Sequence, residues 1–186
     1  MKARILVWLV ALFCCHNVLF AQKEFVNASA RLSGHPRILL QKGEEKALKK
    51  VIMKDAVWKD IHQSLVDEAG EIVKLPLNER IKTGRRLLSV SRENLRRIFI
   101  LSYAYRMTGK NEFLKRAESE MLKAASFSDW NPSHFLDVGE MTMALAIGYD
   151  WLYPQLSVQT KKEIENAIVE KGLKPSFDER YNWFVN

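Results

Sequence analysis

The chain has 186 residues, 29 Lys and Arg against 22 Asp and Glu, a formal net charge of +7 and two cysteines. Both cysteines, Cys14 and Cys15, lie in a segment that we expect to be cleaved, which excludes a disulfide-stapled scaffold and a thiolate metal site in the mature protein. The basic excess suits an anionic partner, although solvated charges on a basic exported protein explain it equally well. Nucleic acid is not expected, because acidic residues are interspersed among the basic ones and no aromatic-rich basic stripe is present.

The N-terminus has the three-part layout of a secretory signal peptide. Two basic residues precede an apolar run over residues 5–15, and Ala21 follows a short polar break. The run is shorter than the roughly 20 residues that a membrane-spanning helix needs. We therefore predict a signal peptide over 1–21, a mature chain over 22–186 with a net charge of about +5, a periplasmic or secreted location, and no membrane partner after cleavage.

The mature chain is predicted to be all-α, with no β-strand pattern of consequence. An irregular leading segment over 27–40 contains Gly34 and Pro36 as breakers. A polar stretch is expected around 76–90. Apolar residues at spacings of three and four predict helices over about 43–53, 56–73, 91–108, 111–125 and 132–153, and a further helix after Pro154. Gly109 is the predicted C-terminal glycine of the helix over 91–108, and Gly172 is predicted to end the last helix.

The stretch from Trp130 to Tyr153 is the most informative part of the sequence. Asn131 is the predicted N-cap, and Pro132 suits the first helical position. From Met141 onward the helix is apolar almost all round, so we expect it to be buried among other helices. Its polar residues gather at its N-terminal end, where free backbone N–H groups and the helix dipole favour an anion or a hydroxyl-rich ligand.

A short repeat links two of the predicted helices. The residues from Leu101 to Tyr105 (Leu-Ser-Tyr-Ala-Tyr) recur 44 residues later as Leu145 to Tyr149 (Leu-Ala-Ile-Gly-Tyr). Each copy closes a mostly apolar helix and leads into a charged one. A helical hairpin of this length, with one buried and one solvated member, is the unit of a helical solenoid or toroid. About three such hairpins fit in the chain, and we expect no closing cap at its end.

Four segments carry a family resemblance. They are Trp130 to Tyr153, residues 35–39 (His-Pro-Arg-Ile-Leu), the pair Ser91 and Arg92, and the turn over 106–109 (Arg-Met-Thr-Gly). In these segments the chain resembles the N-terminal domain of heparinase II/III-type polysaccharide lyases, over nearly all of the mature chain. The resemblance implies a fold made of helical-hairpin repeats that form part of an incomplete (α/α) toroid, followed in the family by a β-sandwich domain.

The resemblance also implies an activity. Members of the family are exported by Gram-negative bacteria and cleave uronic-acid polysaccharides such as heparin, heparan sulfate or alginate by β-elimination. That reaction needs a group that neutralises the carboxylate, a base for the C5 proton and an acid for the leaving oxygen. The family's residues for these tasks have no matching positions here, so we assign no catalytic residue, expect no activity from this chain alone, and expect the rest of the toroid and the β-sandwich to be missing.

The resemblance places four candidate substrate-binding residues on one rim of the toroid. Arg92 is expected to pair with a sulfate or carboxylate, unless it is bonded to Glu93 or another acid. Trp130 is expected to stack on a sugar ring, with core packing at a helix junction as the alternative. Asn131 lies beside Trp130 on this rim. His134 is expected to donate to a substrate anion, with a structural hydrogen bond to Asp137 as the alternative.

Two other functional classes remain open on the sequence. Asp137 and Glu140 share a helical face and invite a glycoside hydrolase interpretation, but neighbours on one helix approach a scissile bond from the same side. The other alternative is a stand-alone, non-catalytic helical carbohydrate-binding module. No cofactor is expected. No metal site is expected either, because His35, His62 and His134 are not in metal-ligand spacing.

Overall fold

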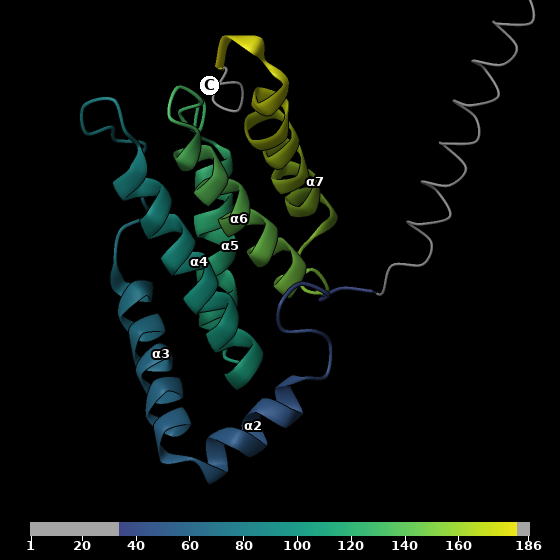
Figure 1. The fold of residues 1–186 in the computed structure, drawn as a ribbon. Coiled ribbons are helices and arrows are strands. Elements are labelled where there is room, and N and C mark those ends of the chain that lie inside the picture. The colour runs from purple at the N-terminus through teal and green to yellow at the C-terminus, as the bar shows by residue number, and fades with distance from the viewer. Residues whose placement is uncertain (1–33, 182–186) are drawn as a thin grey trace, which may run out of the picture. The chain divides into compact units, whose positions relative to one another are not determined.

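The computed structural model of the protein describes residues 34–181, and its regular structure is helical (Figure 1). The predicted signal peptide and the last five residues lie outside this range. The described helices are α2 (Glu45–Lys54), α3 (Ala56–Lys74), α4 (Leu88–Thr108), α5 (Asn111–Ala125), α6 (Phe135–Leu152), α7 (Val158–Ala167), a π-helix (Ile168–Leu173) and two short 3-10 helices (Lys174–Phe177 and Glu179–Tyr181). Residues 34–181 contain no strand, so the all-α prediction is confirmed for them.

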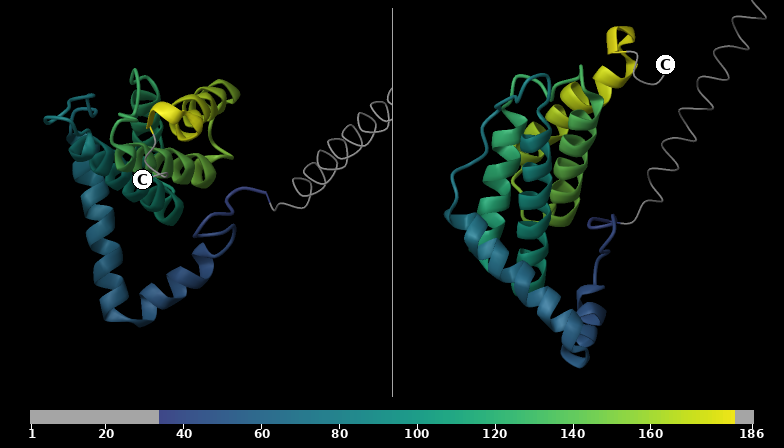
Figure 2. Two further views of the ribbon diagram at one scale, coloured as in Figure 1. Left: turned by 45° about the horizontal axis from the view of Figure 1, so that its top comes forward. Right: turned by 60° about the vertical axis from the view of Figure 1, so that its left-hand side comes forward.

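Helices α4 and α6 lie side by side and carry most of the core, while α5 and α7 lie together on one side of this pair (Figure 1, Figure 2). The repeated sequence accounts for this arrangement. Leu101 of α4 and Leu145 of α6 occupy the same place in the two copies, and both side chains are fully buried. The charged helices that follow, α5 and α7, bury one apolar side each, as Phe113 and Ile164 show.

Helix α6 begins at Phe135, three residues later than predicted. Asn131 adopts a left-handed backbone conformation with φ +60°, so it does not act as an N-cap. Its side-chain amide donates instead to the backbone oxygen of Arg85 at 2.9 Å and to Asp137 Oδ2 at 2.7 Å. The local Asn-Pro signal was therefore misleading, because bonds to a distant segment fix the turn before α6.

Helix α4 begins at Leu88, earlier than the predicted residue 91, and ends as predicted. The backbone N–H of Leu87 donates to Asp137 Oδ2 at 2.7 Å, so a carboxylate from α6 caps the start of α4. At the other end Gly109 has φ +73°, the left-handed conformation that a C-terminal glycine adopts at no steric cost. This confirms the predicted C-terminal glycine.

Gly172 does not end the last predicted helix. Ser157 caps α7, as its hydroxyl accepts from the Thr160 N–H at 3.0 Å, and the helix then widens into the π-helix that contains Gly172. A Cβ atom at this glycine would lie 2.5 Å from Thr142 Oγ1 and 3.2 Å from the Trp130 ring. The glycine is thus needed for close approach of the π-helix to α6.

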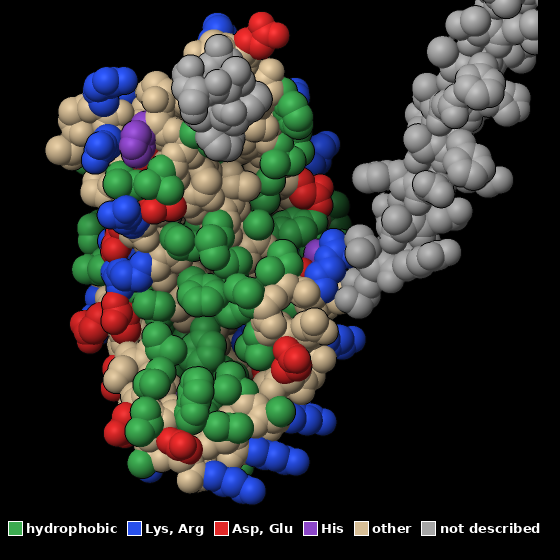
Figure 3. Space-filling view, in the orientation of Figure 1, with side chains coloured by type: hydrophobic (Ala, Val, Ile, Leu, Met, Phe, Trp, Pro, Cys, Tyr) green, Lys and Arg blue, Asp and Glu red, His purple; other side chains and the backbone are tan. Residues whose placement is uncertain are grey.

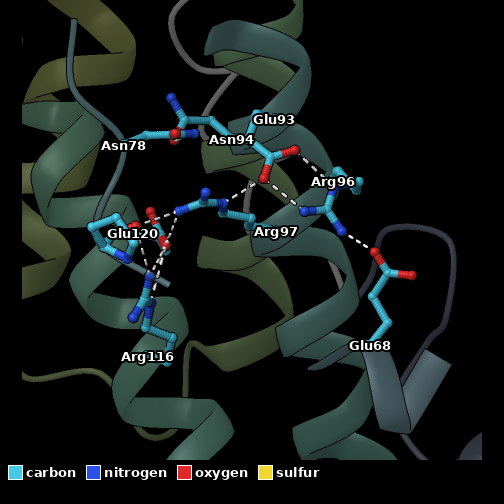
Figure 4. A network of polar contacts seen from close by, with 9 residues as sticks. Glu68, Asn78, Glu93, Asn94, Arg96, Arg97, Arg116 and Glu120 are labelled. Carbon is cyan, nitrogen blue, oxygen red and sulfur yellow. Dashed lines mark hydrogen bonds and ion pairs between the residues drawn. The ribbon is translucent and has the colours of Figure 1, made fainter. Parts of the chain in front are cut away.

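An ion-pair network joins α3, α4 and α5 (Figure 4). Glu120 is fully buried, and its Oε1 atom accepts from Arg97 at 3.1 Å and from Arg116 at 2.7 Å. The same two arginines donate to the backbone oxygens of Val73 and Pro76, next to the C-terminal end of α3. Positive side chains therefore satisfy carbonyl groups that the end of a helix leaves without intrahelical partners.

Candidate functional site

The N-terminal ends of α4 and α6 lie beside each other and beside the loop over 75–87. Figure 3 shows blue and purple side chains gathered at this end, at the upper left of the view. The loop supplies Arg80 and Lys82, and the turn before α6 supplies Ser133 and His134. Segments about 50 residues apart thus form one polar surface at the end of the two central helices.

Asp137 is the buried centre of this end of the molecule. Its side chain is fully buried, with Oδ2 accepting from the Leu87 N–H and the Asn131 amide, and Oδ1 lying 2.9 Å from His134 Nδ1. Its acceptor positions are largely taken by the fold. A carboxylate in this state cannot approach a glycosidic bond, so the pairing of Asp137 with Glu140 as hydrolase carboxylates has no geometric support.

A pocket of about 250 Å³ lies next to this centre, lined by Arg80, Lys82, Asp129 and Ser133 among others. Arg80 Nη2 donates to Asp129 Oδ1 at 2.6 Å, and Arg80 Nε donates to the Asp129 backbone oxygen at 3.0 Å. Lys82 is exposed, and its ammonium group donates to Asn131 Oδ1 at 3.2 Å. Two cations and one carboxylate leave a net positive charge around a cavity wide enough for one anionic substituent.

Asp129 stays ionised within this pocket. Partial burial by itself would raise the pKa of its carboxyl, but the hydrogen bonds from Arg80 and from the Asn131 N–H outweigh burial and hold the pKa below its usual value. The ion pair therefore persists at neutral pH and fixes Arg80, while the exposed Lys82 can exchange its bond to Asn131 for a bond to a ligand.

Arg92 is the most accessible of the predicted binding residues. Its side chain is 63% exposed, and its Nε atom donates to Glu140 Oε1 at 3.2 Å. The second oxygen of Glu140 accepts from the Ser91 hydroxyl at 2.6 Å. An acid does hold Arg92, as the alternative interpretation required, but the acid is Glu140 of α6 and not Glu93. Most of the Arg92 side chain still faces solvent.

Trp130 and Asn131 belong to the packing of the fold. The Trp130 ring has no exposed surface, and its Nε1 donates to the Ala124 backbone oxygen at 3.1 Å, so core packing describes this residue and a sugar cannot stack on it. Asn131 is 2% exposed and has both ends of its amide bonded. We correct both assignments: Trp130 is a core residue, and Asn131 lines the pocket and accepts a hydrogen bond from Lys82.

His134 has features of both interpretations, the structural hydrogen bond and the contact with a ligand. Its side chain is 29% exposed, and its Nδ1 atom faces Asp137, which is the structural bond considered from the sequence. With Nδ1 engaged, Nε2 is the ring nitrogen left for a ligand. The structure thus brings His134 to the same end of the molecule as Arg92, Arg80 and Lys82.

Sequence reasoning missed Arg80 and Lys82. Both lie in the irregular stretch between α3 and α4, about 50 residues before the turn that they contact, and no periodicity points to them. The available signal was the run of basic residues in that stretch, which contains Arg85 and Arg86 as well. A basic loop before an inner helix indicates an anion site.

Among residues 34–181 no group of three or more His, Cys, Asp or Glu side chains is arranged to hold a metal ion. No helix in the same range is long and apolar enough to cross a membrane.

In comparisons with known proteins, neither a family model nor a curated protein matches the chain.

Proposed function

We propose that this chain is the N-terminal toroid portion of an exported polysaccharide lyase and that it binds a uronic-acid-containing, anionic polysaccharide at the N-terminal ends of α4 and α6. The observation that carries the proposal is the positive pocket there, in which Lys82 and Arg80 stand beside Ser133 with Arg92 nearby. Arginine and lysine at such a site suit sulfate and carboxylate groups.

The helix arrangement supports a toroid. Two hairpins, α4 with α5 and α6 with α7, repeat one pattern in which the first helix is central and the second lies outside it. Stacking of such hairpins in a ring would bring the N-terminal ends of successive inner helices toward one cleft. Ligand groups bound by Arg92 and Lys82 would then lie on the rim of that cleft.

Binding without catalysis is the activity expected of this chain by itself. Among the described residues near the pocket, the carboxylates Asp129, Asp137 and Glu140 are each bonded within the fold. None is free to take a proton from C5 of a uronate. A stand-alone carbohydrate-binding module remains the second candidate, and it shares the same site and the same ligand chemistry.

The test is binding of the full chain to immobilised heparin and alginate, with neutral dextran as the reference. We expect binding to both polyanions, weakened by salt, and none to dextran. The double variant Lys82→Gln with Arg92→Gln should lose on the order of tenfold in affinity or more, because each charged hydrogen bond contributes roughly 1.5–3 kcal/mol.

The matched control is Lys115→Gln with Lys162→Gln, which removes two exposed lysines from the outer helices α5 and α7. Its affinity for heparin should fall far less than that of the site variant. Equal losses of heparin affinity in the two variants would mean that the overall positive charge of the protein attracts the polysaccharide. That result would overturn the proposed binding site. Release of unsaturated uronate by the full chain would overturn the expectation that it is inactive.

A further inference from the structure

The corner between α2 and α3 projects away from the four helices α4 to α7 (Figure 1, Figure 2). Helix α2 ends at Lys54, α3 begins at Ala56, and Asp55 between them has an extended backbone. The carboxylate of Asp55 accepts from the Val57 and Trp58 N–H groups at 2.9 and 3.2 Å. The corner is therefore a capped turn with a defined backbone conformation.

Large apolar side chains stand exposed on this corner. Met53 is 75% exposed, Val57 65% and Trp58 48%, and all three lie within six residues of one another. Single exposed apolar residues are ordinary, but a cluster at a projecting point marks a contact with another surface. Within residues 34–181 about half or more of each of these three side chains stays uncovered.

A row of lysines runs along α2 up to the same corner. Lys46, Lys50 and Lys54 are spaced four residues apart and so share one face of the helix, with Lys49 beside them. Figure 3 shows blue side chains in a row over α2, at the lower right of the view. Across the described part of the chain, no carboxylate pairs with any of these four lysines. The charges of these lysines are therefore available to a partner at the surface.

The acidic residues within α2 and at its two ends are bonded elsewhere. Glu45 binds Arg106 at 2.5 Å, and Glu44 accepts from the Gln41 N–H at 2.7 Å. Asp55 caps α3 as described above. The lysine face of α2 therefore presents an uncompensated positive surface directly beside the apolar cluster.

We propose that the α2–α3 corner docks on an anionic lipid surface, with Met53, Val57 and Trp58 entering the headgroup region while the lysines of α2 contact lipid phosphates. Exposed apolar side chains flanked by lysines are the combination that interfacial membrane contacts use. A polyanionic sugar chain would satisfy the lysines but would leave Met53 and Val57 in water. A lipid surface would bind the lysines through its phosphates and would also remove Met53 and Val57 from water.

This site is separate from the polysaccharide site, since it lies on different helices and uses different residues. It also departs from the sequence-based expectation of no membrane partner. That expectation considered membrane-spanning segments, and the pattern of α2 and α3 does not reveal that the apolar side chains at their junction stay exposed. The proposal concerns contact with a membrane surface and not insertion across it.

The test is sedimentation of the full chain with vesicles of phosphatidylcholine alone or with one third phosphatidylglycerol. We expect binding to the anionic vesicles with a blue shift of Trp58 emission, assigned by its absence in Trp58→Phe. Lys50→Gln with Lys54→Gln should weaken binding about tenfold or more, and Val57→Ser should weaken it severalfold. The apolar run at residues 5–15 is common to all variants, so its contribution cancels in the comparison.

Two matched controls keep the result specific. Lys115→Gln with Lys162→Gln removes the same charge from other helices, and Val158→Ser changes a valine that is 84% exposed on α7. Both controls should bind vesicles like the parent chain. Equal loss in site and control variants, or binding that ignores phosphatidylglycerol, would overturn the proposal. So would concentration-dependent self-association removed by Val57→Ser, which would assign the corner to a second copy of the chain.

Discussion

Arg106 and Asp150 stand 44 residues apart, at equivalent positions of the two repeated helices α4 and α6, and both hold the leading segment that precedes α2. Arg106 donates to the Gln41 backbone oxygen at 3.0 Å and also bonds the Leu40 backbone oxygen. Asp150 accepts from the backbone N–H groups of Arg37 and Ile38 at 2.8 and 2.9 Å. The two copies of the repeat thus place a cationic donor, Arg106, and an anionic acceptor, Asp150, beside one irregular segment. The backbone carbonyl and N–H groups of that segment need both kinds of partner.

Replacing Asp150 should loosen this attachment. Asp150 is 1% exposed and also lies 2.5 Å from His35 Nδ1, so Asp150→Asn weakens three charge-assisted bonds at a buried position. We expect the free energy of unfolding to fall by about 2 kcal/mol. Urea denaturation of the full chain measures this, and cleavage by a protease around residues 35–41 should become faster.

The control for this prediction is Asp60→Asn on α3. Asp60 is exposed, and its replacement should change the free energy of unfolding by no more than about 0.5 kcal/mol. If Asp150→Asn behaves like this control, the contacts of Asp150 do not hold the leading segment.

Gly148 lets α6 approach α4 and α5 closely. A Cβ atom there would lie 2.5 Å from Met121 Sδ and 2.6 Å from Ile98 Cγ2. Met121 is flexible enough to move, but the branched Ile98 is not. Gly148→Ala should therefore lower the free energy of unfolding by about 1–3 kcal/mol, measured by thermal or urea denaturation.

Gly70 provides the opposite case. It lies inside α3 with open space where a Cβ would stand, so Gly70→Ala should raise the free energy of unfolding by about 0.5–1 kcal/mol. Two Gly→Ala changes within helices are thus expected to have opposite signs. If both changes raise the free energy of unfolding, the side chains around Gly148 move aside without destabilising the fold.

The features that sequence reasoning predicted correctly depend on local signals. Helix α5 has the predicted bounds, Asn111–Ala125, and α4 ends at the predicted Gly109. Periodicity and a left-handed glycine act within a few residues, so a single sequence contains them. The repeat of Leu101 to Tyr105 likewise identified the two central helices, because both copies place apolar residues such as Leu101 and Leu145 at buried positions.

The features that were missed depend on contacts between distant segments. Nothing local to Leu87 shows that Asp137 caps α4, and nothing local to Asn131 shows that Arg85 bonds its side chain. The same limit explains the pocket, since Lys82 reaches the turn before α6 across about 50 residues. Of the four predicted binding residues, Trp130 and Asn131 are buried by the fold, while Arg92 and His134 keep exposed surface.

Glu120 should be the most costly acid to neutralise on α5. It is fully buried and forms ion pairs with Arg97 and Arg116, whose side chains are 8% and 12% exposed (Figure 4). Glu120→Gln leaves the two cations without their shared counter-charge, and we expect a loss of about 3 kcal/mol in the free energy of unfolding. The exposed Glu112→Gln on the same helix is the control, and similar losses in both would contradict this account.

Glu93 should make part of the stability depend on pH. The hydrogen bond from Arg96, together with that from Arg97 and against partial burial, holds the pKa of this carboxyl below its ordinary value of 4.5. A carboxyl with a lowered folded-state pKa contributes stability that is fully present above its unfolded-state pKa and is lost as the pH falls through the folded-state pKa. Glu93→Gln should therefore lower the free energy of unfolding by about 1 kcal/mol at neutral pH.

The difference between parent and Glu93→Gln should shrink as the pH falls below 4.5, and urea denaturation at a series of pH values measures it. Glu71→Gln is the matched control, because Glu71 is 72% exposed and pairs only with Lys74 among the described residues. Exposed pairs contribute little, so the control difference should be small at every pH. A Glu93→Gln difference that stays constant through this range would show that the loss comes from altered packing and not from the charge held by Arg96.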